Sequence, residues 1–319
     1  ETQDITVTVN AVDDPTVVTG GTSGTGDEDG GAITGQIAAT DVEGLTNASA
    51  YAIENQEESG WIQIGGDIDG EAAGDYSGFS VSISDDGSVV AIGAYSNDES
   101  GEDKGHVRIY QNDNGTWTQI GGDIDGEAAG DYSGHSVSLS SDGSLVAIGA
   151  YANDGNGNDS GHVRIYQFDS VGNAWSQLGQ DIDGEAFRDQ SGRSVSLSYD
   201  GSVVAIGAHL NDGNGKDSGH VRIYQYANDS WTQIGGDIDG EAAGDFSGYS
   251  VSLSSDASVV AISAVNNDGQ NGGQSGHVRI YQYANDSWTQ IEGDIDGETT
   301  GDFSGGSVSL SSDGSFVAI

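Results

Sequence analysis

A short acidic motif, Asp-Ile-Asp-Gly-Glu, recurs five times and holds the residues whose types and spacing could do chemistry. One more Asp follows each copy, four residues after the Glu. Calcium prefers about six to eight hard oxygen ligands, and alternating acids around a glycine can supply them. The candidate metal-ligating residues are Asp67, Asp69, Glu71, Asp75, Asp123, Asp125, Glu127, Asp131, Asp181, Asp183, Glu185, Asp189, Asp237, Asp239, Glu241, Asp245, Asp294, Asp296, Glu298 and Asp302.

The same acids have a second interpretation, in which they cap turns where one repeat crosses over to the next. The motif is shorter than an EF-hand loop and lacks its full order of ligands. Both interpretations stay open at this point. Ca²⁺ is the only cofactor that we expect.

Two further sets of polar residues recur. Loops rich in Asn, Asp and Gly stand at 97–105, 153–161, 211–219 and 267–276, and their variable length and charge favour solvated loops over metal sites. Histidine recurs at His106, His162, His220 and His277, and an arginine follows each two residues later, at Arg108, Arg164, Arg222 and Arg279. We interpret the histidines as structural strand residues. We predict that each arginine pairs with a blade acid, with the Asp-Ile-Asp-Gly-Glu motif as the first candidate.

Catalytic residues should break the regularity of a repeat, because one active site needs only one set. The strongest break is "EAFRDQSGR" at 185–193, with Phe187, Arg188, Gln190 and Arg193. This segment is either a ligand-binding site on one blade or the result of sequence drift. No Gly-x-Ser-x-Gly or phosphate-binding loop is found. We therefore expect no catalytic residues and no enzymatic activity.

Charge and composition exclude several classes of function. Of 319 residues, 52 are Asp or Glu and 8 are Lys or Arg, for a net charge of −44. Such a chain repels nucleic acids and anionic membrane surfaces. The acids suit solubility in salty water or neutralisation by Ca²⁺. No Cys is present, so disulfides and thiolate metal sites are excluded.

Two observations bear on location. No apolar run approaches the roughly 20 residues of a membrane helix, so we expect no membrane insertion of this segment. The opening "ETQDITVTVN" reads as the middle of a strand rather than a signal peptide, so we expect the chain to be part of a longer protein.

The elements that position these residues belong to a long repeat. The five tryptophans, Trp61, Trp117, Trp175, Trp231 and Trp288, are spaced by 56, 58, 56 and 57 residues. One unit predicts four strands, at 135–140, 144–150, 161–167 and 175–179, with a tight turn at 141–143. The tryptophans are predicted to pack in the core or between blades, with carbohydrate stacking as the alternative. No segment has a helical period, so the chain is predicted to be all-β.

Repeats of four antiparallel strands and about 57 residues predict a β-propeller. A β-solenoid is the alternative, but its rungs are usually shorter. The predicted blades are 78–122, 134–180, 192–236 and 248–293, with a composite blade made of 305–319 and 50–66. That composite blade would close a ring of five blades.

The repeat resembles the FG-GAP repeats of integrin-α-like propellers over roughly residues 50–319. The resemblance rests on "SGFSVSISDDGSVVAIGA" at 77–94, its counterparts, and the later "GHVRIY". Many members carry a long calcium loop between the first two strands. Here that loop is only "SDDG", "SSDG", "SYDG" or "SSDA", so the resemblance does not imply the usual family metal site.

Residues 1–46 are similar to part of the cadherin-like repeats of bacterial adhesins, through "ITVTVNAVDD" and the acidic "DEDG" (27–30) and "DVEG" (41–44). The resemblance implies calcium binding at domain junctions. We predict a short N-terminal β segment and linker over 1–46 and propeller repeats over 47–319.

These observations predict a non-enzymatic, extracellular adhesion or binding module of a large secreted or cell-surface protein, stabilised by calcium. Its partners would be protein or glycan surface ligands. The alternatives are a lectin-like or glycan-active propeller, and a structural subunit of a surface layer or filament that contacts neighbouring subunits.

Overall fold

The computed structural model describes residues 17–20, 37–40 and 62–319 and is all-β there, with no helix. The chain divides into two compact units, Glu1–Ile62 and Gln63–Ile319. The described part of the first unit is one antiparallel pair, β1 (Val17–Gly20) and β2 (Ile37–Thr40). The cadherin-like interpretation of 1–46 lies largely outside the described residues, as does the boundary at residue 46. No helix that could cross a membrane occurs in the described residues.

The second unit begins with a four-stranded antiparallel sheet, which we call blade one. Its order is β3 (Ser80–Ile83), β4 (Val89–Ala94), β5 (His106–Asp113) and β6 (Thr116–Gln119), and β7 (Ile124–Asp125) also pairs with β5. The sequence explains the second strand, because "VVAIGA" is apolar at every position and is almost entirely buried.

Three more blades repeat this order. Blade two holds β8 (Ser133–Leu139), β9 (Leu145–Ala150), β10 (His162–Asp169), β11 (Ala174–Gln177) and β12 (Ile182–Asp183). Blade three holds β13 (Ser191–Leu197), β14 (Val203–Ala208), β15 (His220–Ala227), β16 (Ser230–Gln233) and β17 (Ile238–Asp239). Blade four holds β18 (Ser247–Leu253), β19 (Val259–Ala264), β20 (His277–Ala284) and β21 (Ser287–Asp296). The predicted propeller fold of four-stranded blades is confirmed.

The acidic motif does not lie wholly in the crossover between blades, and this part of the prediction is wrong. In blade one Ile124 pairs with Val107 and Asp125 pairs with His106, so the Asp-Ile-Asp half continues the fourth strand. In blade four the same half is part of the uninterrupted β21. The motif is therefore held by strand pairing, and only its Gly-Glu end turns towards the next blade.

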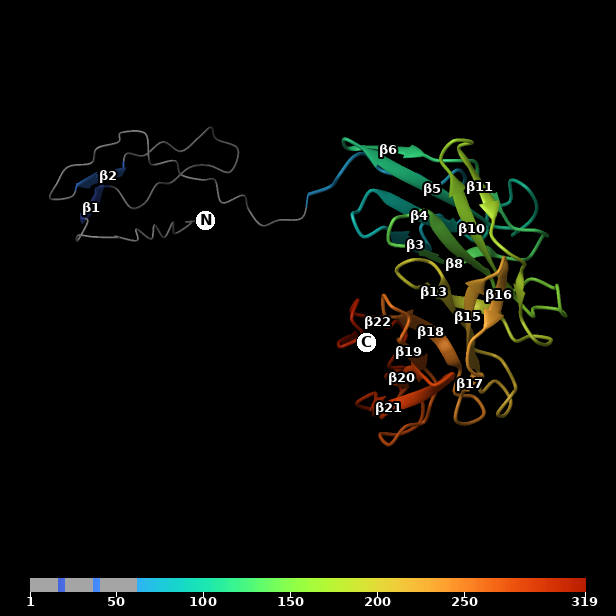
Figure 1. Cartoon of the computed structure of the whole chain (residues 1–319). Helices are drawn as coiled ribbons and strands as arrows, with labels where there is room; N and C mark the ends of the chain where they lie inside the picture. Colours follow the sequence, from blue (N-terminus) through green and yellow to red (C-terminus); the bar gives the residue numbers. More distant parts are fainter. Residues whose placement is uncertain (1–16, 21–36, 41–61) are drawn as a thin grey trace. The chain divides into compact units, whose positions relative to one another are not determined.

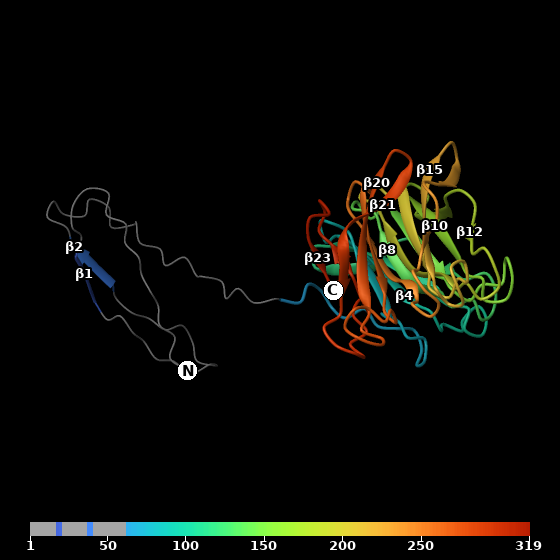
Figure 2. The same ribbon diagram turned by 90° about the horizontal axis from the view of Figure 1, so that it is seen from below.

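Successive blades lie side by side in both views of the ribbon (Figures 1 and 2). β4 contacts β8, β9 contacts β13, and β14 contacts β18. In blade two, the two faces of the first strand contact different neighbouring blades. Val137 and Leu139 pack against blade one, while Ser136 Oγ donates to Gly192 O of blade three at 2.8 Å.

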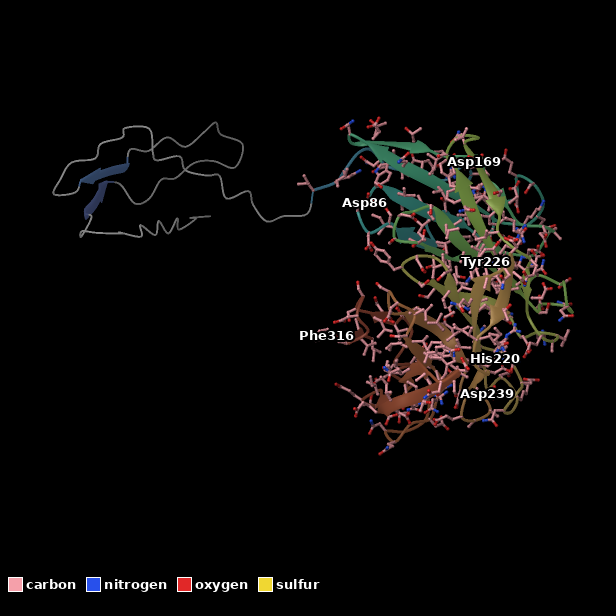
Figure 3. All side chains as sticks on the ribbon, in the orientation of Figure 1. Asp86, Asp169, His220, Tyr226, Asp239 and Phe316 are labelled. Carbon is pink, nitrogen blue, oxygen red and sulfur yellow. The ribbon has the colours of Figure 1, made fainter. Side chains whose placement is uncertain are left out.

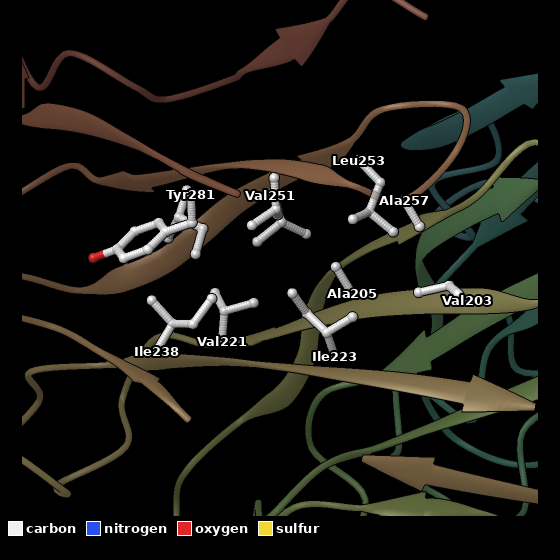
Figure 4. Close-up of a cluster of buried hydrophobic side chains, with 11 residues drawn as sticks. Val203, Ala205, Val221, Ile223, Ile238, Val251, Leu253, Ala257 and Tyr281 are labelled. Carbon is white, nitrogen blue, oxygen red and sulfur yellow. The ribbon is translucent and has the colours of Figure 1, made fainter. Parts of the chain in front are cut away.

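The core lies between blades as well as within them. Figure 4 shows one such cluster, in which Val221 and Ile223 of blade three face Val251 and Leu253 of blade four. Because each blade exposes apolar positions on both faces, every interior blade needs two neighbours to bury them.

The last strands form a separate antiparallel pair, β22 (Ser309–Leu310) and β23 (Val317–Ala318). They are the first two strands of the predicted composite blade. Most of its other half, 50–61, lies outside the described residues, and 62–66 is not in a strand. The ring of five blades therefore stays a prediction.

Candidate functional site

Four clusters of a Glu, a His and an Asp recur in the described residues, each where one copy of the acidic motif meets the blade that follows it. In blade two these are His162 at the start of β10, Asp181 just before β12, and Glu127, which arrives from the motif of blade one. One ligand atom from each lies within 4.8 Å of the others. The equivalent groups are Glu71, His106 and Asp123; Glu185, His220 and Asp237; and Glu241, His277 and Asp294.

Strand pairing sets two of the three side chains. His162 pairs with Asp183 across β10 and β12, which fixes Asp181 two residues away. The same pairing places His220 opposite Asp239 on β15 and β17, and these two side chains lie near each other in Figure 3.

An arginine of each "GHVRIY" strand contacts the glutamate of the preceding motif copy and holds it beside the histidine. Arg164 Nη2 donates to the main-chain oxygen of Asp125 at 2.7 Å, and its Nη1 lies 3.6 Å from Glu127 Oε1. The guanidinium carbon also lies 5.5 Å from the centre of the Tyr166 ring. Arg108, Arg222 and Arg279 repeat this arrangement with Glu71, Glu185 and Glu241. The predicted pairing of each arginine with a motif acid is confirmed, and the acid comes from the motif copy that precedes the arginine's blade.

The histidine is the buried member of each cluster. His162 is 1% exposed, and its Nδ1 lies 3.7 Å from Glu127 Oε2 without a hydrogen-bond partner. Burial, helped by the nearby Arg164 charge, lowers the pKa of His162 to about 4, although Asp181 and Asp131 oppose the shift. The imidazole is therefore neutral at pH 7, which is the form that binds metals.

The structural interpretation of these histidines was therefore incomplete. They are buried strand residues, as predicted, and they also meet the motif acids, which was not predicted. Cross-strand pairing between the "GHVRIY" strand and the Asp-Ile-Asp strand was the signal that could have found them.

The last Asp of each motif copy has a structural role. Asp131 is buried, and its Oδ2 accepts bonds from Ala128 N at 2.9 Å and Asn153 Nδ2 at 3.0 Å. Asp75, Asp189 and Asp245 make the same pair of contacts with Ala72 and Asn97, Ala186 and Asn211, and Ala242 and Asn267. Among the described residues, the four acids of one copy do not form one site. A cluster takes its Glu from one copy and its Asp from the next.

The remaining motif acids lie outside the clusters. Asp69, Asp125, Asp183 and Asp239 give their main-chain oxygens to the arginines, and Asp296 pairs with His277 across the strands. Asp67 accepts a bond from Gln63. Asp302 caps a turn through Thr299, and Glu298 is exposed.

The described tryptophans pack between blades, which confirms one of the two predicted roles. Trp175 Nε1 donates to Ile120 O at 2.9 Å, and the Trp175 ring lies against Gly121 of blade one. An open hollow beside this contact is lined by Asp123, Asp125, Tyr166 and Trp175.

Comparison with known families matches this repeat directly. The FG-GAP repeat family matches residues 69–110, 124–166 and 182–224. Three segments of the chain thus match the FG-GAP repeat, and we call the blades described above the FG-GAP array. Each matched segment runs from one acidic motif to the "RIY" strand of the following blade, so it contains one Glu and the histidine that meets it. No curated protein matches the sequence.

Similar solved structures include a periplasmic gluconolactonase of Pseudomonas aeruginosa, with 16% identity, a TM-score of 0.46, and coverage of 68% of this chain and 56% of that one. A putative 6-phosphogluconolactonase from Bacteroides uniformis has 14% identity and a TM-score of 0.47, covering 75% and 63%. A putative TolB from Agrobacterium tumefaciens has 13% identity and a TM-score of 0.40, covering 67% and 61%. The match thus covers less than two thirds of each of these structures.

The prediction that the chain is not an enzyme is wrong as an exclusion. Two of the similar structures are named as lactonases, so chains of related architecture include enzymes. At 14–16% identity the likeness concerns the fold alone, and it assigns no reaction to the FG-GAP array.

Proposed function

We propose that the FG-GAP array is an extracellular binding module of a larger surface protein, used for adhesion, and that divalent cations stabilise its blade interfaces. The observation that carries the proposal is the cluster of two carboxylates and one buried imidazole that recurs in four successive repeats of the described residues.

The charge of each cluster favours a cation. In the cluster of Glu127, His162 and Asp181, two carboxylates face one guanidinium, that of Arg164. The imidazole adds no charge. One negative charge remains uncompensated in a chain that already carries −44. A cation bound there would join Glu127 of one blade to His162 and Asp181 of the next, which links the blades.

Calcium is the first cation to test. Extracellular modules bind calcium with dissociation constants of about 10⁻⁴–10⁻³ M, and carboxylate oxygens are its usual ligands. The imidazole nitrogen suits zinc better than calcium, and carboxylates also suit manganese. Zinc and manganese are therefore the comparison ions.

Adhesion is supported by the character of the array. FG-GAP repeats are typical of extracellular proteins, and their blades present repeated loops and rim hollows to a partner. A strong acidic charge keeps such a module soluble in salty surroundings.

The cation is tested by thermal melting in EDTA and in millimolar CaCl₂, MgCl₂, ZnCl₂ and MnCl₂. At 1 mM calcium and a dissociation constant of about 10⁻⁴ M, a bound ion adds about 1.4 kcal/mol per site, so calcium at four sites should raise Tm by roughly 10 °C. Glu127→Gln should reduce the gain by about a quarter, since it damages one of four clusters. Glu102→Gln, an exposed acid in no cluster, is the matched control and should keep the full gain.

A Tm that no ion raises would refute the cation part of the proposal. Stabilisation by zinc or manganese but not calcium would keep the clusters and refute calcium. Adhesion is tested separately, with beads that carry the chain on immobilised glycans and surface proteins. Retention in calcium and release by EDTA are expected, and beads that bind none of these surfaces would refute adhesion.

A further inference from the structure

A second cluster lies at the starts of the first strands of blades two to four. It contains His135, Arg193 and Tyr249 from the Ser-Gly-x-Ser segments that open β8, β13 and β18. Tyr151 and His209 join it from the residue after β9 and the residue after β14. We call these five residues the Arg193 cluster.

Arg193 is a cation without a carboxylate. Its Nη1 lies 3.0 Å from His135 Nε2, and its Nη2 donates to Tyr249 OH at 2.9 Å. Its guanidinium carbon lies 4.5 Å from the centre of the Tyr249 ring. In the described part of the chain no carboxylate oxygen lies within 4.0 Å of its guanidinium nitrogens. Each arginine of the "GHVRIY" strands, in contrast, faces a glutamate.

The neighbours of Arg193 supply no negative charge. Burial first, and the Arg193 charge second, lower the pKa of His135 to about 3, so this imidazole is neutral. A half-buried guanidinium surrounded by neutral rings attracts an anion, and its planar fork matches a carboxylate.

His209 adds an unused polar atom. It is 8% exposed, and its Nδ1 has no hydrogen-bond partner. Its ring lies 5.7 Å from that of Tyr249, nearly perpendicular to it. A buried polar atom without a partner is costly, and a ligand hydroxyl can satisfy it.

Aromatic rings beside the cluster are held in an uncommon backbone conformation. Tyr132 has a φ of 54° and stacks on Tyr151 at 5.5 Å, and Phe246 has a φ of 58° beside His209. Positive φ recurs at this position in every described repeat, at Tyr76, Tyr132, Gln190, Phe246 and Phe303, so this conformation belongs to the turn of the repeat and fixes where each ring stands. The half-exposed Tyr132 and Tyr151 offer ring faces with polar tips.

The third repeat departs from the others at this place. Gln190 and His209 stand where blades one and two have tyrosines, and Arg193 occupies the variable position of Ser-Gly-x-Ser. Arg193 N donates to Gln190 O, so these departures in the sequence gather in one location. Regular packing alone does not need them.

We propose that the Arg193 cluster binds an acidic sugar, a uronic acid residue of a polysaccharide. The sugar carboxylate would accept hydrogen bonds from the Arg193 guanidinium, and a sugar hydroxyl would donate to His209 Nδ1. The apolar face of the sugar ring would pack on the tyrosines. This inference rests on the proposed binding function and names its ligand.

The test titrates the whole chain with galacturonic acid trisaccharide by calorimetry, in EDTA, beside the methyl ester of the same trisaccharide. Arg193→Gln should weaken binding of the acid by about tenfold or more, the loss expected for a charge-assisted hydrogen-bond pair. Esterification should weaken binding to the native chain equally. Arg188→Gln is the matched control in the same repeat. Arg188 lies over Phe187 outside the cluster, so affinity should stay within about twofold.

His209→Tyr restores the residue of blades one and two and tests the cluster if Arg193→Gln does not fold. It should weaken binding by several fold. Equal binding of acid and ester, equal losses in the Arg188 and Arg193 variants, or no binding of the trisaccharide would each overturn the inference. EDTA removes any role of cations, so a failure here leaves the cation and adhesion tests standing.

Discussion

Individual acids in this chain have different environments despite their similar sequence context. In the hairpins, burial acts to raise the pKa of Asp142, but hydrogen bonds from Ser144 and Ser140 together outweigh it, so the pKa is lowered. In the crossover, burial raises the pKa of Asp189, although Asn211 and Ala186 donate to it. Glu127 instead faces an arginine and a histidine across a blade boundary. Acids of one motif therefore have different roles: the glutamate and the first aspartate join clusters, while the last aspartate caps a turn.

The buried histidines make stability depend on pH. Burial, and then the charge of Arg193, lower the pKa of His209 from 6.5 to about 3. Between these values the unfolded chain binds a proton that the folded chain does not, so stability is complete above pH 6.5 and falls as the pH drops. One such histidine costs about 2 kcal/mol between pH 7 and pH 5.

His209→Tyr should remove the pH-dependent destabilisation that His209 causes. The free energy of unfolding of this variant should therefore fall less on acidification than that of the native chain. Urea unfolding at pH 8, 7, 6 and 5, in EDTA, measures the difference. The pH 8 values set the baseline for any direct effect of the substitution. Parallel pH profiles for the two chains would show that His209 titrates normally in the folded state.

Strands in this fold are shaped by their neighbours on both sides. The Gly-Ala that ends each second strand shows this. A Cβ on Gly149 would lie 2.1 Å from Gly192 O of the next blade and 2.3 Å from Ser136 Oγ. Blade four has Ser263 instead, and its Oγ is used within the blade, accepting from Ser250 N at 2.9 Å. The glycine is thus required where the next blade approaches closely.

Gly149→Ala should lower the free energy of unfolding by about 1–3 kcal/mol, because the methyl group must push the strand of blade three away. Gly122→Ala is the control, since a Cβ there meets nothing within 4 Å and Gly122 has no positive φ. Denaturant unfolding of both variants measures the effect. Equal midpoints for the two would mean that the blades separate easily at this point.

The whole molecule is a series of interfaces rather than a series of independent sites. Each cluster joins the glutamate of one motif copy to a histidine of the blade that follows it. The apolar cores likewise combine side chains of two neighbouring blades. A single FG-GAP blade therefore has no complete cluster.

The excess of 52 acids over 8 bases should make the fold sensitive to salt. Raising NaCl from about 0.05 M to 1 M shortens the screening length to about 3 Å and relieves the self-repulsion of the folded chain. Tm should rise by about 2–4 °C for each kcal/mol of relieved repulsion. Choline chloride is the control for specific sodium binding and should give the same rise. A flat Tm in both salts would contradict this account.

The sequence by itself determined the repeat, the strands, the turns and the partner class of the strand arginines. These features depend on local periodicity and on charge balance, which are visible along the chain. It also marked 185–193 as irregular. It did not determine which copies of the acidic motif meet, because Glu127 and Asp181 are joined only when blades stack.

Tertiary structure decided the sites for this reason. Strand pairing placed His162 beside the next Asp-Ile-Asp segment, stacking brought in Glu127 from the preceding blade, and the same stacking left Arg193 among neutral rings. Side chains some 50 residues apart approach only through the angle and spacing of whole sheets, and no local pattern in the chain encodes that approach.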